Sequence, residues 1–358
     1  MKEIKTILKA YDKLNSEGGQ KAALATVVRV EESSYRRTGA RMLVLDNGVF
    51  IGGISGGCLE GDALRRAQKA ISTGKSTLVT YDTTEDDKHQ IGIGLGCNGV
   101  IDVLLTPLSI KDKNGKNSLD LLKNYTEKRS PNILFTITRA NEDSYFQLGE
   151  TFTLKQINSF GTHKTPIEKE VEAVLLHKKS KIVPFENFNV LIEFLPPVVH
   201  LVLFGGNYDV LPLARMGREL GWKVTVVTNI NKAQKGLFEV SDQVIDKTAD
   251  VPIDDYTAFV FMSHDYKTDL NLLKKYAPSV VSYIGMLGPR KRAEKVFTEM
   301  EEEGLDIPHD RIFAPVGLDI GATTPEAIAL SILAEIQTHF GGRSAKSLKY
   351  RQGSIHER

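Results

Sequence analysis

The sequence is poor in cysteine and tryptophan, with only two and one of these among its 358 residues. Two cysteines cannot build a disulfide framework, and such scarcity is typical of proteins that work in a reducing compartment. Residues 1–15 have the apolar spacing of an amphipathic helix and lack the continuous apolar run of a signal peptide. We therefore predict a cytoplasmic protein that does not depend on disulfides.

An excess of charge and a long apolar run are also missing. Lys and Arg together number 46 against 45 for Asp and Glu, which gives a net charge of +1. No bulk field then draws the protein to a polyanion, so we expect no nucleic-acid partner. No stretch approaches the roughly 20 apolar residues of a membrane span, so we expect no membrane partner. The nucleophile elbow, the HExxH pair and the Walker loop are absent, and hydrolase or ATPase activity has no signature to rest on.

The length and the hydrophobic content of 41% suit two packed domains. Pro196 and Pro197 form a stiff junction, after which the residue pattern changes. We expect an N-terminal domain at residues 1–195, a second domain at 198–342 and a flexible basic tail at 343–358.

The first domain has the pattern of an α/β fold. Val, Leu and Ile dominate two segments at 22–30 and 41–53, and Asn47–Gly48 supplies a tight hairpin turn within the second. Apolar spacing predicts a helix at 58–72, with one glycine-rich loop before it and another before a strand that follows Gly99. For the remainder we expect a helix and an antiparallel extension, with strands at 132–140, 145–150, 172–177 and 189–195.

Strand and helix patterns alternate after residue 198, beginning with the buried run "HLVLFGG" and the helix "DVLPLARMGRELG". This alternation predicts a Rossmann-like, doubly wound parallel sheet. The fold class is therefore α/β, an N-terminal domain with cysteine-bearing glycine loops followed by a Rossmann-like domain.

The first turn of the second domain carries an incomplete dinucleotide fingerprint. Gly205 and Gly206 are present, but Asn207 and Val210 stand where further glycines are expected. The second strand ends in Thr228 and Asn229 rather than in an acid that would bind a ribose hydroxyl. Binding of NAD(P) or another nucleotide therefore stays an open alternative.

Three further loops carry candidate residues, and the first of them follows a predicted strand end, where open α/β sheets bind ligands. "SHDYKTD" carries His264 and Asp265, which make either an acid/base pair or, more simply, a helix cap. Gly288 and Arg290 lie at the start of a helix whose first turn is basic, where an anion would balance the charge. Asp319 lies in "GLDIGATTPEAIALSILAEI", which leads into a helix with Thr324 as its N-cap.

Four segments together resemble one known family. They read "GARMLV…GGISGGCLEGDA", "GIGLGCNGVIDVLL", "SHDYKTDL…YIGMLGPRKRAEKV" and "PVGLDIGATTPEAIALSILAEI". The sequence is similar to the XdhC/CoxF maturation factors of xanthine dehydrogenase and carbon monoxide dehydrogenase, whose N-terminal domain is XdhC/CoxI-like. The resemblance implies a homodimeric chaperone that binds molybdenum cofactor, supports its sulfuration by a cysteine desulfurase, and delivers it to a molybdenum hydroxylase of the xanthine dehydrogenase type.

The same resemblance points to the two cysteines as ligands of the cofactor's molybdenum or as sulfur carriers. Cys58 lies at a predicted helix start, where the dipole favours a thiolate, and Glu60 follows it. A buried, merely packed cysteine is the plain alternative, and a zinc site of Cys58, Cys97 and His89 is another. The expected cofactor-binding residues are Cys58, Cys97, Gly56, Gly57, Glu60, Gly96, Gly99, Arg41, Gly205, Gly206, Asn207, His264, Asp265, Gly288, Arg290 and Asp319.

The leading hypothesis is therefore a molybdenum-cofactor chaperone rather than a catalyst. The alternative is an NAD(P)-dependent oxidoreductase that uses the second domain, with Cys58 as a redox or substrate residue. A nucleotide-sensing regulatory protein without chemistry of its own is a third hypothesis.

Overall fold

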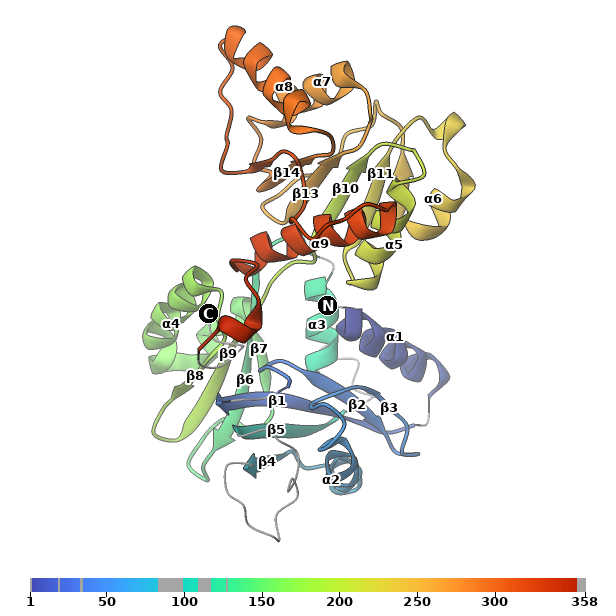
Figure 1. Cartoon of the computed structure of the whole chain (residues 1–358). Helices are drawn as coiled ribbons and strands as arrows, with labels where there is room; N and C mark the ends of the chain where they lie inside the picture. The colour runs from blue at the N-terminus through green and yellow to red at the C-terminus, as the bar shows by residue number, and fades with distance from the viewer. Residues whose placement is uncertain are drawn as a thin grey trace. The chain divides into compact units, whose positions relative to one another are not determined.

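The computed structural model describes residues 2–18, 20–32, 35–82, 99–108, 117–126 and 128–352. The chain forms two compact units, essentially residues 3–197 and residues 198–350 (Figure 1). We call them the N-terminal unit and the C-terminal unit, and describe each by itself.

The N-terminal unit begins with a five-stranded antiparallel sheet, in the order β3-β2-β1-β5-β4. Its strands are β1 (Ala22–Glu32), β2 (Arg41–Leu45), β3 (Phe50–Gly52), β4 (Thr77–Asp82) and β5 (Gly99–Leu108). The predicted hairpin is confirmed: β2 and β3 pair across the turn at Asn47–Gly48, where Gly48 has a φ of +86°.

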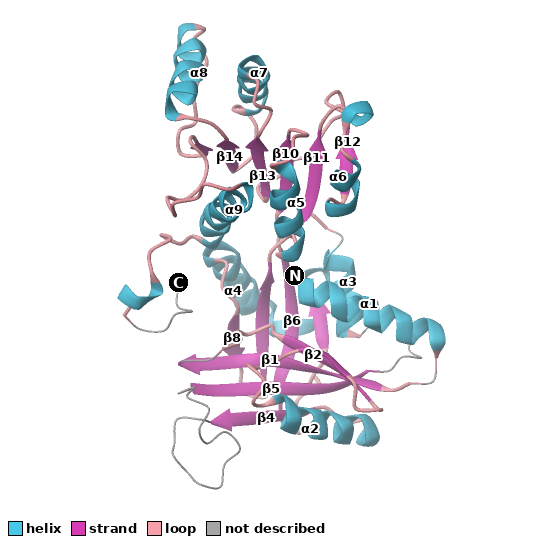
Figure 2. Ribbon diagram, turned by 45° about the vertical axis from the view of Figure 1, so that its right-hand side comes forward, coloured by secondary structure: helices cyan, strands magenta, loops and turns pink. Residues whose placement is uncertain are grey.

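Helices cover both faces of this sheet (Figure 2). Because successive strand residues point to opposite faces, Leu24 packs toward α1 and α3 while its neighbours Ala23 and Ala25 pack toward α2. Each fully buried leucine or isoleucine contributes about 1.5–3 kcal/mol to this packing. The helices are α1 (Lys2–Glu17), α2 (Glu60–Thr73) and α3 (Ser118–Thr126).

The rest of the N-terminal unit forms a sheet of its own, in the order β7-β6-β9-β8. All its pairings are antiparallel, as predicted. Its elements are β6 (Asn132–Ala140), β7 (Thr151–Thr153), the 3-10 segment η1 (Leu154–His163), α4 (Lys164–His177), β8 (Lys181–Pro184) and β9 (Phe188–Leu195).

Two predicted strands in this region are wrong. Residues 172–177 end helix α4, because Ile167, Val171 and Val174 recur at helical spacing and form its buried face. Residues 145–150 form turns, in which Phe146 packs against Phe188 with ring centroids 4.8 Å apart. A short run of apolar and aromatic residues resembles a strand in sequence, but here it only anchors a turn.

A buried ion pair links the two sheets of the N-terminal unit. Arg41 on β2 donates to Glu193 on β9 through Nη1 (2.9 Å to Oε1) and Nη2 (2.5 Å to Oε2). The two side chains are only 3% and 4% exposed. Gly39 has a φ of +91°, and a Cβ there would overlap the Glu193 carboxylate. The Arg41 guanidinium is thus held by a buried carboxylate and has a structural role, and its expected part in cofactor binding stays a prediction.

The C-terminal unit has a six-stranded, fully parallel sheet in the order β12-β11-β10-β13-β14-β15. This is the strand order of the Rossmann fold, and the predicted fold class is confirmed. The strands are β10 (His200–Phe204), β11 (Lys223–Val227), β12 (Gln243–Ile245), β13 (Thr257–Phe261), β14 (Tyr283–Met286) and β15 (Ile312–Phe313).

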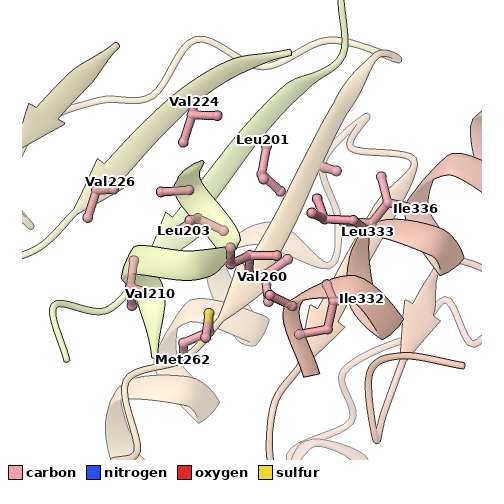
Figure 3. Packing of buried hydrophobic residues seen from close by; sticks show 14 of the residues in the cluster. Leu201, Leu203, Val210, Val224, Val226, Val260, Met262, Ile332, Leu333 and Ile336 are labelled. Atoms are coloured by element: carbon pink, nitrogen blue, oxygen red, sulfur yellow. The ribbon is translucent and has the colours of Figure 1, made fainter. Parts of the chain in front are cut away.

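Two apolar layers enclose this sheet. On one face, Leu201, Val260 and their neighbours pack against Val210 of α5 and Ile332 of α9 (Figure 3). On the other face, the alternate strand residues pack against α7 and α8. The helical elements are α5 (Val210–Glu219), η2 (Ile230–Lys232), α6 (Lys235–Val240), α7 (Tyr266–Tyr276), α8 (Arg290–Glu302), α9 (Pro325–Gly341) and η3 (Leu348–Tyr350).

In the part of the chain that the structure describes, no helix combines the length and the apolar character that crossing a membrane requires.

Candidate functional site

The loop that carries Cys58 runs from β3 to the start of α2 and is held by Glu60. The Glu60 Oε1 atom accepts hydrogen bonds from the backbone N–H groups of Ser55 (2.8 Å) and Ile54 (3.2 Å). The Ser55 hydroxyl donates to the other carboxylate oxygen. Glu60 therefore folds back onto the loop that precedes its own helix and fixes where that loop starts.

The Ser55 hydroxyl then fixes the position of the thiol. Its oxygen accepts from the N–H groups of Gly57 (3.2 Å) and Leu59 (3.1 Å). The Cys58 Sγ atom lies 3.5 Å from the same oxygen, and the side chain is half-buried. Gly57 has a φ of +110°, which favours glycine at this turn. The thiol thus lies at a helix start on a loop with defined hydrogen bonds.

The protonation state of Glu60 follows from these contacts. Burial favours the neutral acid, but the hydrogen bonds from Ser55 and Ile54 outweigh burial and lower the pKa of Glu60 below its usual 4.5. The carboxylate is therefore ionised at neutral pH and acts as the acceptor that the loop requires.

Asp62, the second acid of the motif, is turned away from the thiol loop. It accepts a hydrogen bond from the Tyr81 hydroxyl (2.9 Å) and pairs with Arg66, one turn further along α2. Burial opposes its ionisation, yet the hydrogen bonds from Arg66 and Tyr81 lower the pKa of Asp62. Asp62 thus ties α2 to β4.

The thiol loop still has open binding groups. The N–H groups of Gly56 and Cys58 have no acceptor among the described residues. The ring of Tyr35 covers Gly56, since a Cβ at Gly56 would lie 3.5–3.8 Å from three ring carbons. Tyr35 is 70% exposed, so much of its ring surface is available for stacking. Sequence reasoning missed Tyr35, which no glycine or cysteine motif marks.

The second half of the expected two-loop site lies outside the described residues. This holds for Gly96, Cys97 and His89. Gly99 is described and begins β5, where it pairs with Glu32 of β1. Among the described residues no three His, Cys, Asp or Glu side chains are arranged to hold a metal ion. The zinc alternative needs Cys97 and His89, so it stays a prediction.

A second group of predicted residues lies at the carboxyl ends of β10 and β13. Gly205 and Gly206 are required by close packing, because a Cβ would overlap the Met262 carbonyl oxygen in the first case and the Thr228 hydroxyl in the second. Asn207 follows them and is exposed. The two glycines therefore have a packing role, with or without a ligand.

His264 does not pair with Asp265, as an acid/base pair would require. Asp265 caps α7 by accepting from the Thr268 N–H (2.8 Å), which confirms the simpler prediction. The Nε2 atom of His264 instead lies 2.7 Å from Oδ2 of Asp209, a residue 55 positions away in sequence. Asp209 was missed because nothing local connects the two loops.

The charged side chains of Asp269 and Arg292, close to His264 in the fold, are paired with each other. Asp269 pairs with Arg292 (2.7 Å) and accepts from Ser263. Burial raises the pKa of Asp269, although Ser263 and Arg292 work in the opposite direction. Arg292, in the first turn of α8, thus supplies the positive charge that pairs with Asp269.

The remaining predicted residues lie in loops or at helix starts. Gly288 has a φ of +146°, which favours glycine, and the exposed Arg290 begins α8. Asp319 is exposed in the loop before α9, whose N-cap is Thr324 as predicted. These positions give no indication of a shared pocket.

Comparison with known proteins agrees with this architecture. Residues 201–336 match the XdhC Rossmann domain, and residues 16–82 match the XdhC and CoxI family. The chain is similar in fold to a solved xanthine dehydrogenase from Bacillus halodurans, with a TM-score of 0.74, 26% identity, and coverage of 97% of this chain and 98% of that one.

Two curated relatives cover most of the chain. A probable xanthine dehydrogenase subunit from Bacillus subtilis is 30% identical, over 89% of this chain and 93% of the relative. The molybdenum cofactor insertion chaperone PaoD of Escherichia coli is 24% identical, over 89% of this chain and 83% of the relative.

Replacement of Glu60 tests the hydrogen-bond arrangement of the thiol loop. Glu60→Gln leaves the loop N–H groups with a neutral acceptor, and we expect the free energy of unfolding at neutral pH to fall by about 1–3 kcal/mol. Because the folded-state pKa of Glu60 is lowered, its contribution is present above the ordinary value and is lost as pH falls through the lowered pKa. Urea unfolding from about pH 6 to pH 3 should thus show a smaller loss of stability in the variant than in the wild type. Equal pH slopes would contradict the assignment.

Proposed function

The chain belongs to the XdhC and CoxI family, and we propose that it is a maturation factor that binds molybdenum cofactor and inserts it into an enzyme of the xanthine dehydrogenase type. One relative, similar over most of its length, is named a molybdenum cofactor insertion chaperone. The observation that carries the proposal is the loop at Cys58, where a half-buried thiol lies at a helix start.

The groups on this loop suit the chemistry of the cargo. Molybdenum cofactor presents a metal with sulfur and oxygen ligands, a pterin and a phosphate. A thiolate is a suitable soft ligand, and backbone N–H groups that have no acceptor among the described residues suit oxygen atoms of the cargo. We assign Cys58 to the metal, the N–H groups of Gly56 and Cys58 to oxygen atoms, and the Tyr35 ring to the pterin. Cys97 would be a second ligand in the same site.

We further propose the partners that such a role requires. The client is a molybdenum hydroxylase of the xanthine dehydrogenase type, a proposal supported by the names of the relatives. A cysteine desulfurase would supply sulfur for sulfuration, and the protein would act as a cytoplasmic homodimer. These partners rest on family membership, not on a contact in the described residues.

Loss of the Cys58 thiol tests the proposal directly. We expect Cys58→Ala to reduce retention of molybdenum cofactor at least about tenfold, which corresponds to about 1.4 kcal/mol. The purified protein is incubated with isolated cofactor and passed through gel filtration, and bound pterin is quantified as its fluorescent oxidation product. NADH and NADPH are titrated in parallel.

Ser72→Ala, at the exposed carboxyl end of the same helix, is the matched control and should bind as the wild type does. Retention by Cys58→Ala at the wild-type level would contradict the role of the thiol. Hydride transfer from NADH, without binding of molybdenum cofactor, would favour the oxidoreductase instead.

Tyr35 supplies a second test. If its ring stacks on the pterin, Tyr35→Leu should weaken cofactor binding by about 1–3 kcal/mol, a value typical of stacking between aromatic side chains and heterocyclic bases. Tyr35→Phe keeps the ring and should bind within about threefold of the wild type. The same retention assay measures both variants. A Leu variant that binds as the wild type does, or a Phe variant as weak as the Leu variant, would exclude stacking.

A further inference from the structure

Dinucleotide-binding folds hold the pyrophosphate of their ligand at the carboxyl ends of the strands of the parallel sheet. In the C-terminal unit, the carboxylate of Asp209 lies at this place. The strand order reverses between β10 and β13, and in open α/β sheets ligands bind at the carboxyl ends of the strands at this point. The pyrophosphate then lies at the N-terminus of the helix after the first strand. In this chain that helix is α5, and Asp209 is its N-cap residue.

The Asp209 side chain is mostly buried and is held by a hydrogen bond to His264. Its side chain is 13% exposed and accepts no hydrogen bond from the N–H groups of its own helix. Oδ2 is bonded to His264, and Oδ1 is buried without a partner among the described residues. A negative charge is stabilised by the helix dipole here, as a bound anion would be. The carboxylate therefore takes the electrostatic place of the ligand's anion.

His264 is oriented by this carboxylate. An ionised carboxylate only accepts hydrogen bonds, so the proton of the neutral imidazole lies on Nε2. Nδ1 is then an acceptor, and it has no partner among the described residues. His264 is 49% exposed and has a φ of +56°, an uncommon conformation for a residue with a side chain. The contact between the two loops thus leaves one acceptor nitrogen without a partner among the described residues, on a half-exposed side chain.

Acidic groups already offset the cations near this pair. Nη2 of Arg292 donates to Asp269, and Asp265, which caps α7, adds a negative charge that interacts with Arg292 and Lys247. The Nε atom of Arg292 has no partner among the described residues. On the side where a ribose would lie, the Asn229 side chain accepts from the Asn231 N–H (3.0 Å) and so stabilises its own turn. The carboxyl ends of these strands thus lack two features of a dinucleotide site, a vacant position for an anion and an acidic residue that binds the ribose.

We propose that Asp209 is a built-in anion that excludes the pyrophosphate of dinucleotides from this Rossmann fold. In the Asp209–His264 pair, the carboxylate holds the proton of His264 on Nε2 and leaves Nδ1 as the acceptor. This proposal does not rest on cofactor binding at Cys58, a residue of the N-terminal unit.

Removing the charge of Asp209 should uncover anion binding. The full-length wild type, Asp209→Asn and Asp310→Asn are titrated with NADH, NADPH and inorganic pyrophosphate by calorimetry. Asp310 is an exposed acid shortly before β15, which is an edge strand of the parallel sheet, and it serves as the matched control. We expect Asp209→Asn to bind at least one of the three at least tenfold more tightly than the wild type and the control do. No gain in Asp209→Asn would overturn the exclusion, as would tight binding of NADH or NADPH by the wild type.

The state of the imidazole gives a second readout that does not depend on a ligand. Nitrogen NMR of labelled wild-type protein in weakly alkaline buffer, where imidazoles are neutral, reports which ring nitrogen of His264 carries the proton. We expect the Nε2–H form in the wild type and a mixture of both forms in Asp209→Ala. A wild-type protein with the proton on Nδ1 would overturn the proposed orientation. Circular dichroism of each variant confirms that it folds.

Discussion

The candidate site of the N-terminal unit depends on one carboxylate, that of Glu60. It is the acceptor for two consecutive N–H groups and for the Ser55 hydroxyl, whose oxygen in turn accepts from Gly57 and Leu59. A loop rich in glycine has much conformational freedom to lose, and these bonds select one conformation from it. The position of Cys58 is therefore set by a network within the motif, before any ligand arrives.

The C-terminal unit has a common fold, for which we propose an uncommon ligand preference. Its strand order is that of a Rossmann fold, and two glycines, Gly205 and Gly206, follow the first strand. Gly205 and Gly206 are needed for packing against Met262 and Thr228, so their presence carries little information about a nucleotide. In our proposal, ligand preference is determined instead by Asp209 and His264, which come from different loops. Two side chains would then decide the ligand preference of this fold, in keeping with the general rule that a fold does not fix a function.

Much of the fold could be predicted from the sequence because strand alternation and helix spacing are local properties. The hairpin at Asn47–Gly48 and the caps at Asp265 and Thr324 are examples. The prediction for residues 172–177 was wrong because a helix end with several apolar residues resembles a short strand when its upstream turns are ignored. The pairs Arg41–Glu193 and Asp209–His264 could not be predicted, since each joins segments far apart in sequence. Cys58 was proposed as a candidate from the sequence, whereas the role of Glu60 as acceptor for the preceding loop emerged only from the structure.

The proposed function depends above all on contact between the Cys58 thiol and the metal of the molybdenum cofactor. X-ray absorption at the molybdenum edge detects such a contact, by comparing the free cofactor with the cofactor bound to the wild-type protein at full occupancy. We expect at least one more sulfur neighbour of molybdenum in the bound state. An unchanged sulfur shell in the bound cofactor would contradict the assignment of Cys58 to the metal.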